Sequence, residues 1–205
     1  MDAHGQLTPS LDSLAFTDSV TVCRESLRRA VGVSGGPIER HSARVFFIMQ
    51  QLAQEAAAPL DREVAACAAV LHDIGLYDPV AKPRLYLHHG RVAAERVIGS
   101  FSWTAQRRRL CLDAIELHHR LTPQWKKGIE VELLRLADLV DASRGLVSLG
   151  LDQGWLRQLF QAIERRGLQR ELLRHSIRGA PCMTRGLLAT VINTPRRTVR
   201  VDQGA

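Results

Sequence analysis

The sequence predicts an all-α protein folded as a single domain of about eight to nine helices. Aromatic residues make up only 5% of the 205 residues, while Ala, Leu and Arg are abundant, and this composition favours helix. Apolar residues recur at steps of three and four along several segments, and no segment alternates convincingly with period two. The breaks between these segments are mostly short, as in helical domains, and 45% apolar residues suffice for one core.

The first helices are delimited by recognisable start and stop residues. Residues 1–16 show no periodicity, and the first helix is expected to begin at Thr17. A break, SGGP, ends with Pro37, which suits the first turn of a second helix that reaches about residue 57. Asp61 is expected to cap a third helix that runs to His72, and Gly75 is expected to end it.

After a loop at 76–88 that contains two prolines, the pattern is helical again. Further helices are expected at 89–98, 104–120, 129–144, 152–166, 168–178 and 182–192. The chain is therefore divided into an N-terminal segment with one helix at 1–35, a core at 36–150, C-terminal helices that pack on this core at 151–194, and a basic, flexible tail at 195–205.

Charge and cysteine content narrow the class of protein. The formal net charge of +7 suits anionic partners such as nucleotides, nucleic acid or acidic lipid, although short arginine runs can equally be solvated faces. No recognised nucleic-acid-binding motif is present, so nucleic acid is the weaker interpretation. The four cysteines are far apart, which excludes a secreted disulfide framework. Since neither a signal peptide nor a run of ~18 apolar residues is found, we expect a soluble, cytoplasmic protein that does not enter a membrane.

Polar residues occupy positions where a buried apolar residue would be expected. His41 continues the stripe formed by Ile38, Val45 and Leu52 on the second helix. The pair His72 and Asp73 ends the apolar run AAVL, although burying an imidazole and a carboxylate without partners is costly.

The later helices repeat this pattern. His118 shares a face with Cys111 and Ile115, whereas His119 lies about 100° away and is expected to face outward. Asp138 lies near the face of Leu134, and His88 and His89 add a further source at the start of a helix. Each residue alone could be a hydrogen-bonded core residue. Together they indicate a shared divalent metal site, because imidazole and carboxylate suit Zn, Fe and Mn.

The order His41, then His72-Asp73, then Asp138 resembles the HD superfamily of metal-dependent phosphohydrolases, which is named after the adjacent His-Asp pair. The similar stretches run from about 38 to 144. The histidines in HHGRVAAERVI and DAIELHH resemble the subset that holds two metals. Within this subset the chain looks most like the bacterial symmetrical dinucleoside tetraphosphate hydrolases. The likeness rests on three features: His89-Gly90 before an Ala-rich helix, His118 closing AI-x-x-H, and Asp138 in an AD pair six residues before Arg144.

The resemblance implies a ligand for each position. His41, His72, Asp73 and Asp138 would hold one metal, and Asp73 would bridge to a second metal held also by His89 and His118. The choices of His88 against His89 and of His118 against His119 stay open. Two divalent ions are expected, with Fe or Mn preferred and Zn, Ni, Co or Mg compatible.

The implied activity is a metal-dependent phosphohydrolase. It would cleave a phosphoester or phosphoanhydride bond of a nucleotide or another small phosphorylated molecule with metal-activated water. Lys82 and Arg84 on the loop, and Arg144 beyond Asp138, would counter the phosphoryl charge; the alternatives are a solvated loop and a favourable charge at a helix C-terminus. Asp73 would take part in catalysis as the bridging ligand, and Asp141 would orient a ligand or contact substrate.

Two other functions remain open from the sequence. A di-iron oxygenase on the same scaffold would use a similar ligand set, and a non-catalytic nucleotide-sensing domain could keep a metal for stability. The amphipathic C-terminal third could cover the core, close over the site or form a dimer face, so a homodimer is compatible with the sequence.

Overall fold

The computed structural model describes residues 9–33, 35–77, 85–168 and 170–171, and all regular secondary structure in these ranges is helical. The predicted all-α class is therefore confirmed. The α-helices are α1 (Asp18–Val31), α2 (Pro37–Glu55), α3 (Arg62–Leu71), α4 (Tyr86–Ile98), α5 (Ala105–Leu117), α6 (Ile129–Ala142) and α7 (Gln153–Ala162), and short 3-10 helices are η1 (Asp12–Leu14), η2 (Ile74–Tyr77) and η4 (Trp125–Lys127).

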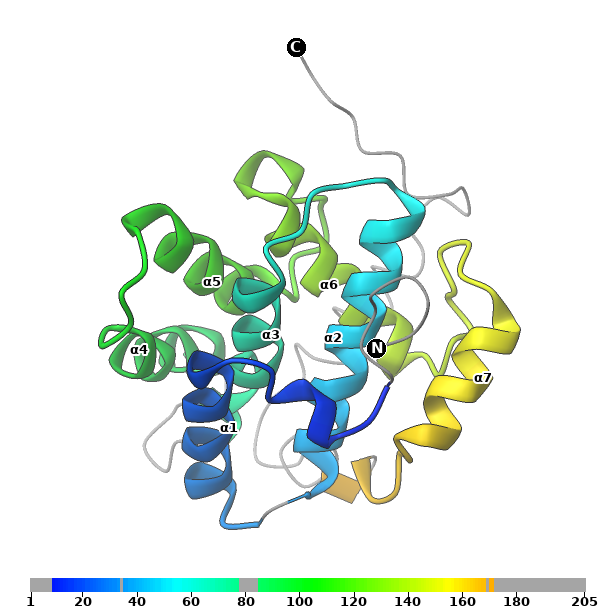
Figure 1. Ribbon diagram of the computed structural model, residues 1–205, viewed down its shortest axis with the longest axis horizontal. Helices are drawn as coiled ribbons and strands as arrows, with labels where there is room; N and C mark the ends of the chain where they lie inside the picture. The colour runs from blue at the N-terminus through cyan, green and yellow to red at the C-terminus, as the bar shows by residue number, and fades with distance from the viewer. Residues whose placement is uncertain (1–8, 34, 78–84, 169, 172–205) are drawn as a thin grey trace.

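Helix α3 lies at the centre and is covered by α1, α2, α5 and α6 (Figure 1). Every residue from Val64 to Leu71 is fully buried, and four of these eight are alanines. A helix that is apolar on all sides must be surrounded, and alanine side chains let the neighbouring helices approach closely. The central position of α3 follows from this composition, and it brings the His-Asp pair after Leu71 into the core.

The predicted helix starts agree with the caps in the structure. The side chains of Thr17 and Asp61 accept hydrogen bonds from the third backbone N–H of α1 and α3, and Pro37 is the first residue of α2. Thr104 and Asp152 cap α5 and α7 in the same way.

Several helix ends differ from expectation. Helix α4 begins at Tyr86 rather than His89, α5 ends at Leu117, and α7 ends at Ala162. Beyond α5 and α7 the chain continues as turns and irregular backbone rather than as helix. Most of the helix expected at 168–178, the helix expected at 182–192 and the basic tail lie outside the described residues. The proposed division into segments stays a prediction. No helix among the described residues combines the length and apolar character needed to cross a membrane.

A buried carboxylate joins α1 to α2. Glu39 is 3% exposed and accepts hydrogen bonds from Arg24 Nη2 at 2.8 Å, Arg28 Nε at 3.0 Å and the backbone N–H of Gly35 at 2.7 Å. Burial alone would raise the pKa of Glu39, but the two guanidinium groups and the N–H of Gly35 outweigh burial and lower this pKa below its ordinary value of 4.5.

Replacing Glu39 tests this junction. Because the folded-state pKa is lowered, the ionised carboxylate stabilises the fold fully above pH 4.5, and this contribution is lost as the pH falls through the folded-state pKa. We expect Glu39→Gln to reduce the free energy of unfolding by roughly 3 kcal/mol at pH 7 and to flatten its dependence on pH below 4.5. Urea denaturation across pH 2.5–7 measures both, with Glu25→Gln, an exposed carboxylate on α1, as the control. Equal pH dependence in both variants would contradict the account.

Candidate metal centre

Five predicted ligand residues from four helices meet at one point in the core. His41 comes from α2, His72 and Asp73 follow α3, His118 follows α5, and Asp138 lies on α6. All five are buried, with exposed fractions between 0% and 7%. The structure therefore brings together five of the six residues that the sequence singled out as metal ligands.

The three buried imidazoles present the same nitrogen to this point. His72 and His118 are the C-cap residues of α3 and α5, and their Nδ1 atoms lie 2.8 Å from the carbonyl oxygens of Ala69 and Ile115. Those carbonyls lie in the last helical turn, where no backbone N–H completes the helical pattern. His41 Nδ1 lies 2.6 Å from Asp141 Oδ2. Each Nδ1–H is thus used as a donor, so each Nε2 is the nitrogen that can bind a metal once it carries no proton, as in metal-ligating histidines.

The inward nitrogens of His41 and His72 must share a proton or a metal ion. His41 Nε2 and His72 Nε2 are 3.1 Å apart, and two lone pairs at that distance repel each other unless a proton or a metal ion lies between them. His118 Nε2 is buried and has no hydrogen-bond partner among the described residues. Buried polar atoms rarely stay unpaired, and bound metal ions would satisfy all three nitrogens. The donor set therefore fits a divalent transition metal.

Two aspartates, Asp73 and Asp138, each direct their two carboxylate oxygens toward different histidines of the site. Asp73 Oδ2 lies 3.3 Å from His72 Nε2, and its Oδ1 lies 3.9 Å from His118 Nε2. Asp138 Oδ1 lies 3.3 Å from His41 Nε2, and its Oδ2 lies 3.3 Å from His119 Nε2. The possible ligands thus form two groups, one of His41, His72 and Asp73 and one of His118, His119 and Asp138. A carboxylate with one oxygen toward each group can bridge two ions.

His119 does not face outward, and that prediction was wrong. Its side chain is 15% exposed, its Nε2 faces Asp138, and its Nδ1 lies 2.5 Å from the hydroxyl of Tyr86 on α4. The end of α5 lies between α4 and α6, so two adjacent faces of its last turn are covered rather than one. Helical periodicity along α5 alone could not reveal the second face.

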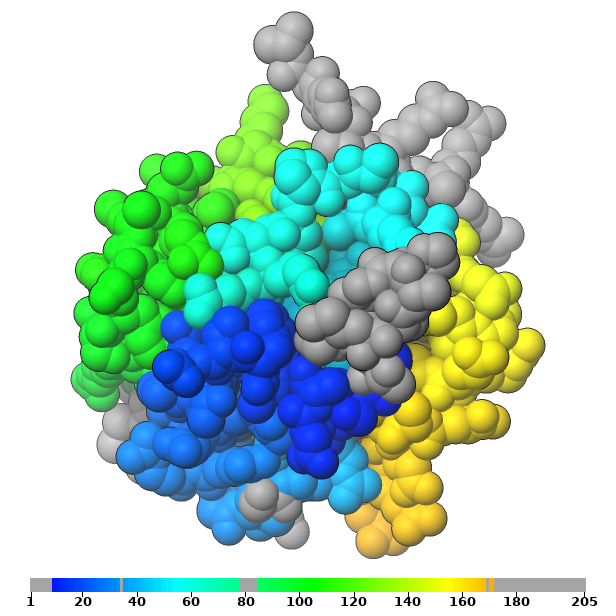
Figure 2. Space-filling view, in the orientation of Figure 1, coloured from blue at the N-terminus to red at the C-terminus, as the bar shows by residue number. Residues whose placement is uncertain are grey.

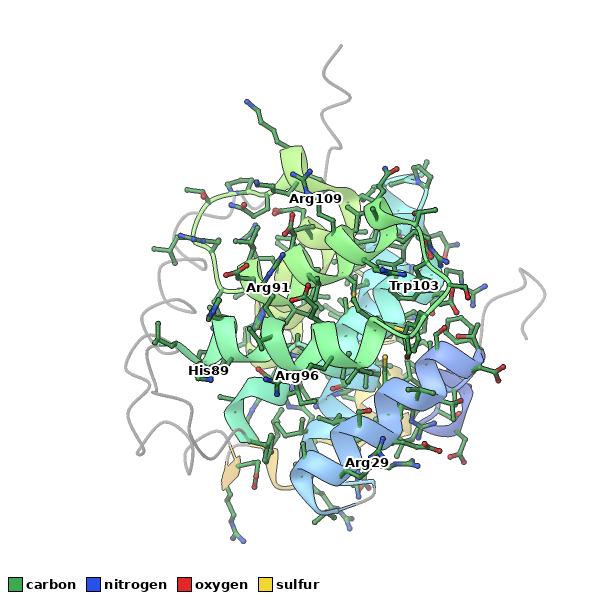
Figure 3. All side chains as sticks on the ribbon, turned by 90° about the vertical axis from the view of Figure 1, so that its left-hand side faces the viewer. Arg29, His89, Arg91, Arg96, Trp103 and Arg109 are labelled. Atoms are coloured by element: carbon green, nitrogen blue, oxygen red, sulfur yellow. The ribbon has the colours of Figure 1, made fainter. Side chains whose placement is uncertain are left out.

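His89 and His88 lie on the first turn of α4, outside both ligand groups (Figure 3). His89 is half-buried, and its role as a ligand stays a prediction. The His88 side chain is 62% exposed, and its Nδ1 lies 3.7 Å from a carboxylate oxygen of Glu116 on α5. Its surroundings are therefore those of a surface residue.

Asp141 faces His41 and buried arginines. Arg44 donates from Nε to Asp141 Oδ1 at 2.6 Å and from Nη2 to Oδ2 at 3.0 Å, while His41 Nδ1 contacts Oδ2. Arg44 and Asp141 are both fully buried. Of the two predicted roles for Asp141, this geometry favours orientation of a ligand over contact with substrate.

The basic residues predicted to bind phosphate are placed only in part. Arg144 is exposed just after α6, with a φ of 58°, and its backbone N–H donates to the carbonyl of Asp141. The helix therefore ends two residues before the predicted end at Arg144. Lys82 and Arg84 lie outside the described residues. Binding of phosphate by these three residues stays a prediction.

The surroundings of His41 and His118 shift the pKa values of these two histidines in opposite directions. Burial lowers the pKa of His41, but hydrogen bonds to Asp138 and Asp141 outweigh burial and raise this pKa to about 9. Burial, together with the neighbouring His119 and His72, lowers the pKa of His118 to about 3. Burial opposes ionisation of Asp73, but His72 and His41 outweigh it and lower the pKa of Asp73. The site thus holds carboxylates in the ionised form that metal binding requires.

These features define a helical protein with a buried cluster of histidines and aspartates suited to holding a metal, and comparison with known families identifies the class. The sequence model of the HD domain matches residues 38–143, just over half of the chain, and the chain belongs to the HD domain family. HD domains are typically metal-dependent hydrolases. No curated protein and no solved structure matches the chain. The matched range contains every residue of the two ligand groups.

A close backbone contact holds the segment after the His-Asp pair. Gly75 was expected to end α3, but α3 already ends at Leu71, and Gly75 lies in η2 without a positive φ. A Cβ atom at Gly75 would overlap the carbonyl oxygen of Tyr86 and approach Gly90 N to 2.6 Å. Glycine is therefore needed because η2 and α4 touch there, not because the chain turns.

The two glycines at this contact should respond differently to alanine. Gly75→Ala forces the backbones of η2 and α4 apart, so we expect a loss of roughly 3 kcal/mol in unfolding free energy and weaker metal binding. In Gly90→Ala the new Cβ would meet its nearest atom, Gly75 N, at 3.5 Å, an ordinary contact, and alanine favours helix. Thermal denaturation and Co²⁺ titration of both variants measure the difference. Equal stability of the two variants would contradict this explanation.

Proposed function

We propose that this protein hydrolyses a phosphoester or phosphoanhydride bond of a nucleotide or another small phosphorylated molecule, with the help of two divalent metal ions. The proposal rests on three buried histidines whose Nε2 atoms converge while their Nδ1 atoms are hydrogen-bonded to other groups. Such histidine tautomers, together with two ionised carboxylates, match the needs of metal ligation more closely than those of a hydrogen-bonded core.

Each ligand group would hold one ion. His41, His72 and Asp73, with Asp138 Oδ1 nearby, would hold the first, and His118 and His119, with Asp138 Oδ2, would hold the second. The described geometry supports His119 rather than His89 as the nitrogen ligand beside His118. Mixed nitrogen and oxygen ligands suit Fe or Mn, which remain the proposed metals.

The ions, once bound, would lower the pKa of a water and polarise the phosphorus–oxygen bond. The protein residues would keep the site in position: Asp73 and Asp138 span both ligand groups, and Tyr86 fixes the ring of His119. Arg144, and Lys82 and Arg84 on the loop, are proposed to attract the anionic substrate, in line with the net charge of +7. A soluble, cytoplasmic location and action on small molecules rather than nucleic acid complete the proposal.

Phosphate release tests this activity. We expect the protein reconstituted with Fe²⁺ or Mn²⁺ to release phosphate, or to cleave a symmetrical dinucleoside tetraphosphate, within a panel of nucleotides and simple phosphomonoesters. His118→Ala and His119→Ala should each reduce kcat/KM at least ~100-fold, because a ligand nitrogen is lost. Asp113→Asn, which removes a carboxylate paired with Arg91 on the outer side of α5, should change it less than about twofold.

The alternatives give different results. Oxygen uptake with an organic substrate, without phosphate release, would favour the di-iron oxygenase. Nucleotide binding without turnover in the metal-loaded protein would favour a sensing domain. Full activity of His119→Ala would leave the hydrolase in place but would return the second ligand position to His89.

A further inference from the structure

The segment that follows α7 runs back to the metal centre. Residues 163–168 pass beside the start of α2 along one flank of the molecule (Figures 1 and 2). Ile163 and Leu168 are buried, and a Cβ atom at Gly167 would lie 3.0 Å from the ring of Pro37. This segment, here called the strap, lies outside the range matched by the HD domain model, which ends at residue 143.

One side chain of the strap reaches the partner of His41. Arg165 Nη1 donates to Asp141 Oδ1 at 2.9 Å and also to the backbone carbonyl of Asp141. The Arg165 side chain is 15% exposed. The guanidinium group of Arg165 therefore binds both the carboxylate and the backbone carbonyl of Asp141.

Residues of the HD core also donate hydrogen bonds to the backbone of the strap. Arg44 Nη1 donates at 3.2 Å to the carbonyl oxygens of both Ile163 and Glu164, while the rest of the Arg44 guanidinium binds Asp141. Just beyond the strap, Tyr77 in η2 donates to Glu171 at 2.9 Å. The strap and the residues that follow it are thus bonded to α2, to α6 and to the short helix that comes directly after the His-Asp pair.

We propose that Arg165 is a positioning residue of the metal centre, which fixes the Asp141 carboxylate and thereby the imidazole of His41. The inference deepens the proposed function, because it assumes that His41 serves a metal. It assigns to the C-terminal part of this chain a share in the site that the HD core does not supply alone.

The geometry explains why a second arginine matters. Asp141 Oδ2 is shared by His41 and Arg44, whereas Oδ1 receives one hydrogen bond from Arg44 and one from Arg165. Without Arg165, the carboxylate keeps only Arg44 on that oxygen and can rotate about the His41 contact. Since the Nδ1–H of His41 has Asp141 as its acceptor, this rotation would change the direction of its Nε2.

The neighbouring arginine provides a matched control. Arg166 differs by one position, carries the same charge, and pairs through an 81% exposed side chain with Glu164 at the surface. Arg165→Ala and Arg166→Ala therefore change the net charge equally, but only the first removes a contact with Asp141. Arg165→Lys keeps the charge and removes the planar guanidinium group, whose Nη1 reaches both acceptors on Asp141.

Two measurements on the full-length protein test the proposal. The first is the ¹H–¹⁵N resonance of His41 Nδ1–H in metal-free protein, assigned by its absence in His41→Asn. The second is the Kd for Co²⁺, followed by its visible absorption. We expect Arg165→Ala to shift or broaden the His41 resonance and to raise the Kd about tenfold or more. Arg165→Lys should fall between, and Arg166→Ala should match wild type within about twofold.

The outcomes separate this inference from the proposed function. An unchanged His41 resonance and Co²⁺ Kd in folded Arg165→Ala would overturn the positioning role, even if the protein hydrolyses phosphate. A shifted His41 resonance in a protein that binds no metal would support the positioning role while the proposed function fails. If Arg165→Ala does not fold, the comparison passes to Arg165→Lys, where an unchanged His41 resonance and Kd overturn the proposal.

Discussion

The 3.1 Å approach of two imidazole nitrogens, His41 Nε2 and His72 Nε2, is the constraint on which the rest of the site depends. Both rings are buried, and the outer nitrogen of each is held by an acceptor, so neither ring can turn away. A cation between them removes the repulsion, and Asp73 and Asp138 supply negative charge around the same point. The fold thus keeps four polar side chains in an arrangement that a bound metal ion makes favourable, with a proton on His41 as the substitute in the metal-free protein.

Helix ends are the means by which the fold builds this arrangement. His72 and His118 each occupy the position just after a helix and use the unpaired carbonyl three residues earlier to hold Nδ1. The alanine-rich α3 carries one of these ends to the centre of the molecule. The contact between Gly75 and α4 then brings Tyr86, the partner of His119, close to the site.

The sequence predicted those parts of the site that follow from periodicity on a single helix. His41 and His118 interrupt apolar stripes, and His72-Asp73 ends an apolar run, so their burial could be inferred from the order of residues alone. His119 was missed because its second covered face is supplied by α4 and α6. Arg44 lies three residues after His41, and Asp141 three after Asp138; that shared spacing was a usable signal for their pairing. Arg165 carried no such signal, since its partner is fixed by how the strap returns to α6.

The central claim is that the convergent histidines and aspartates bind metal, and elemental analysis tests it most directly. The wild-type protein, purified without added metal, is compared with a His72→Ala/Asp73→Ala double variant that circular dichroism shows to be folded. We expect two equivalents of iron or manganese per wild-type chain and loss of both in the variant, because Asp73 faces both ligand groups. Wild-type protein that is folded, contains no metal above background and takes up none on reconstitution would contradict the account.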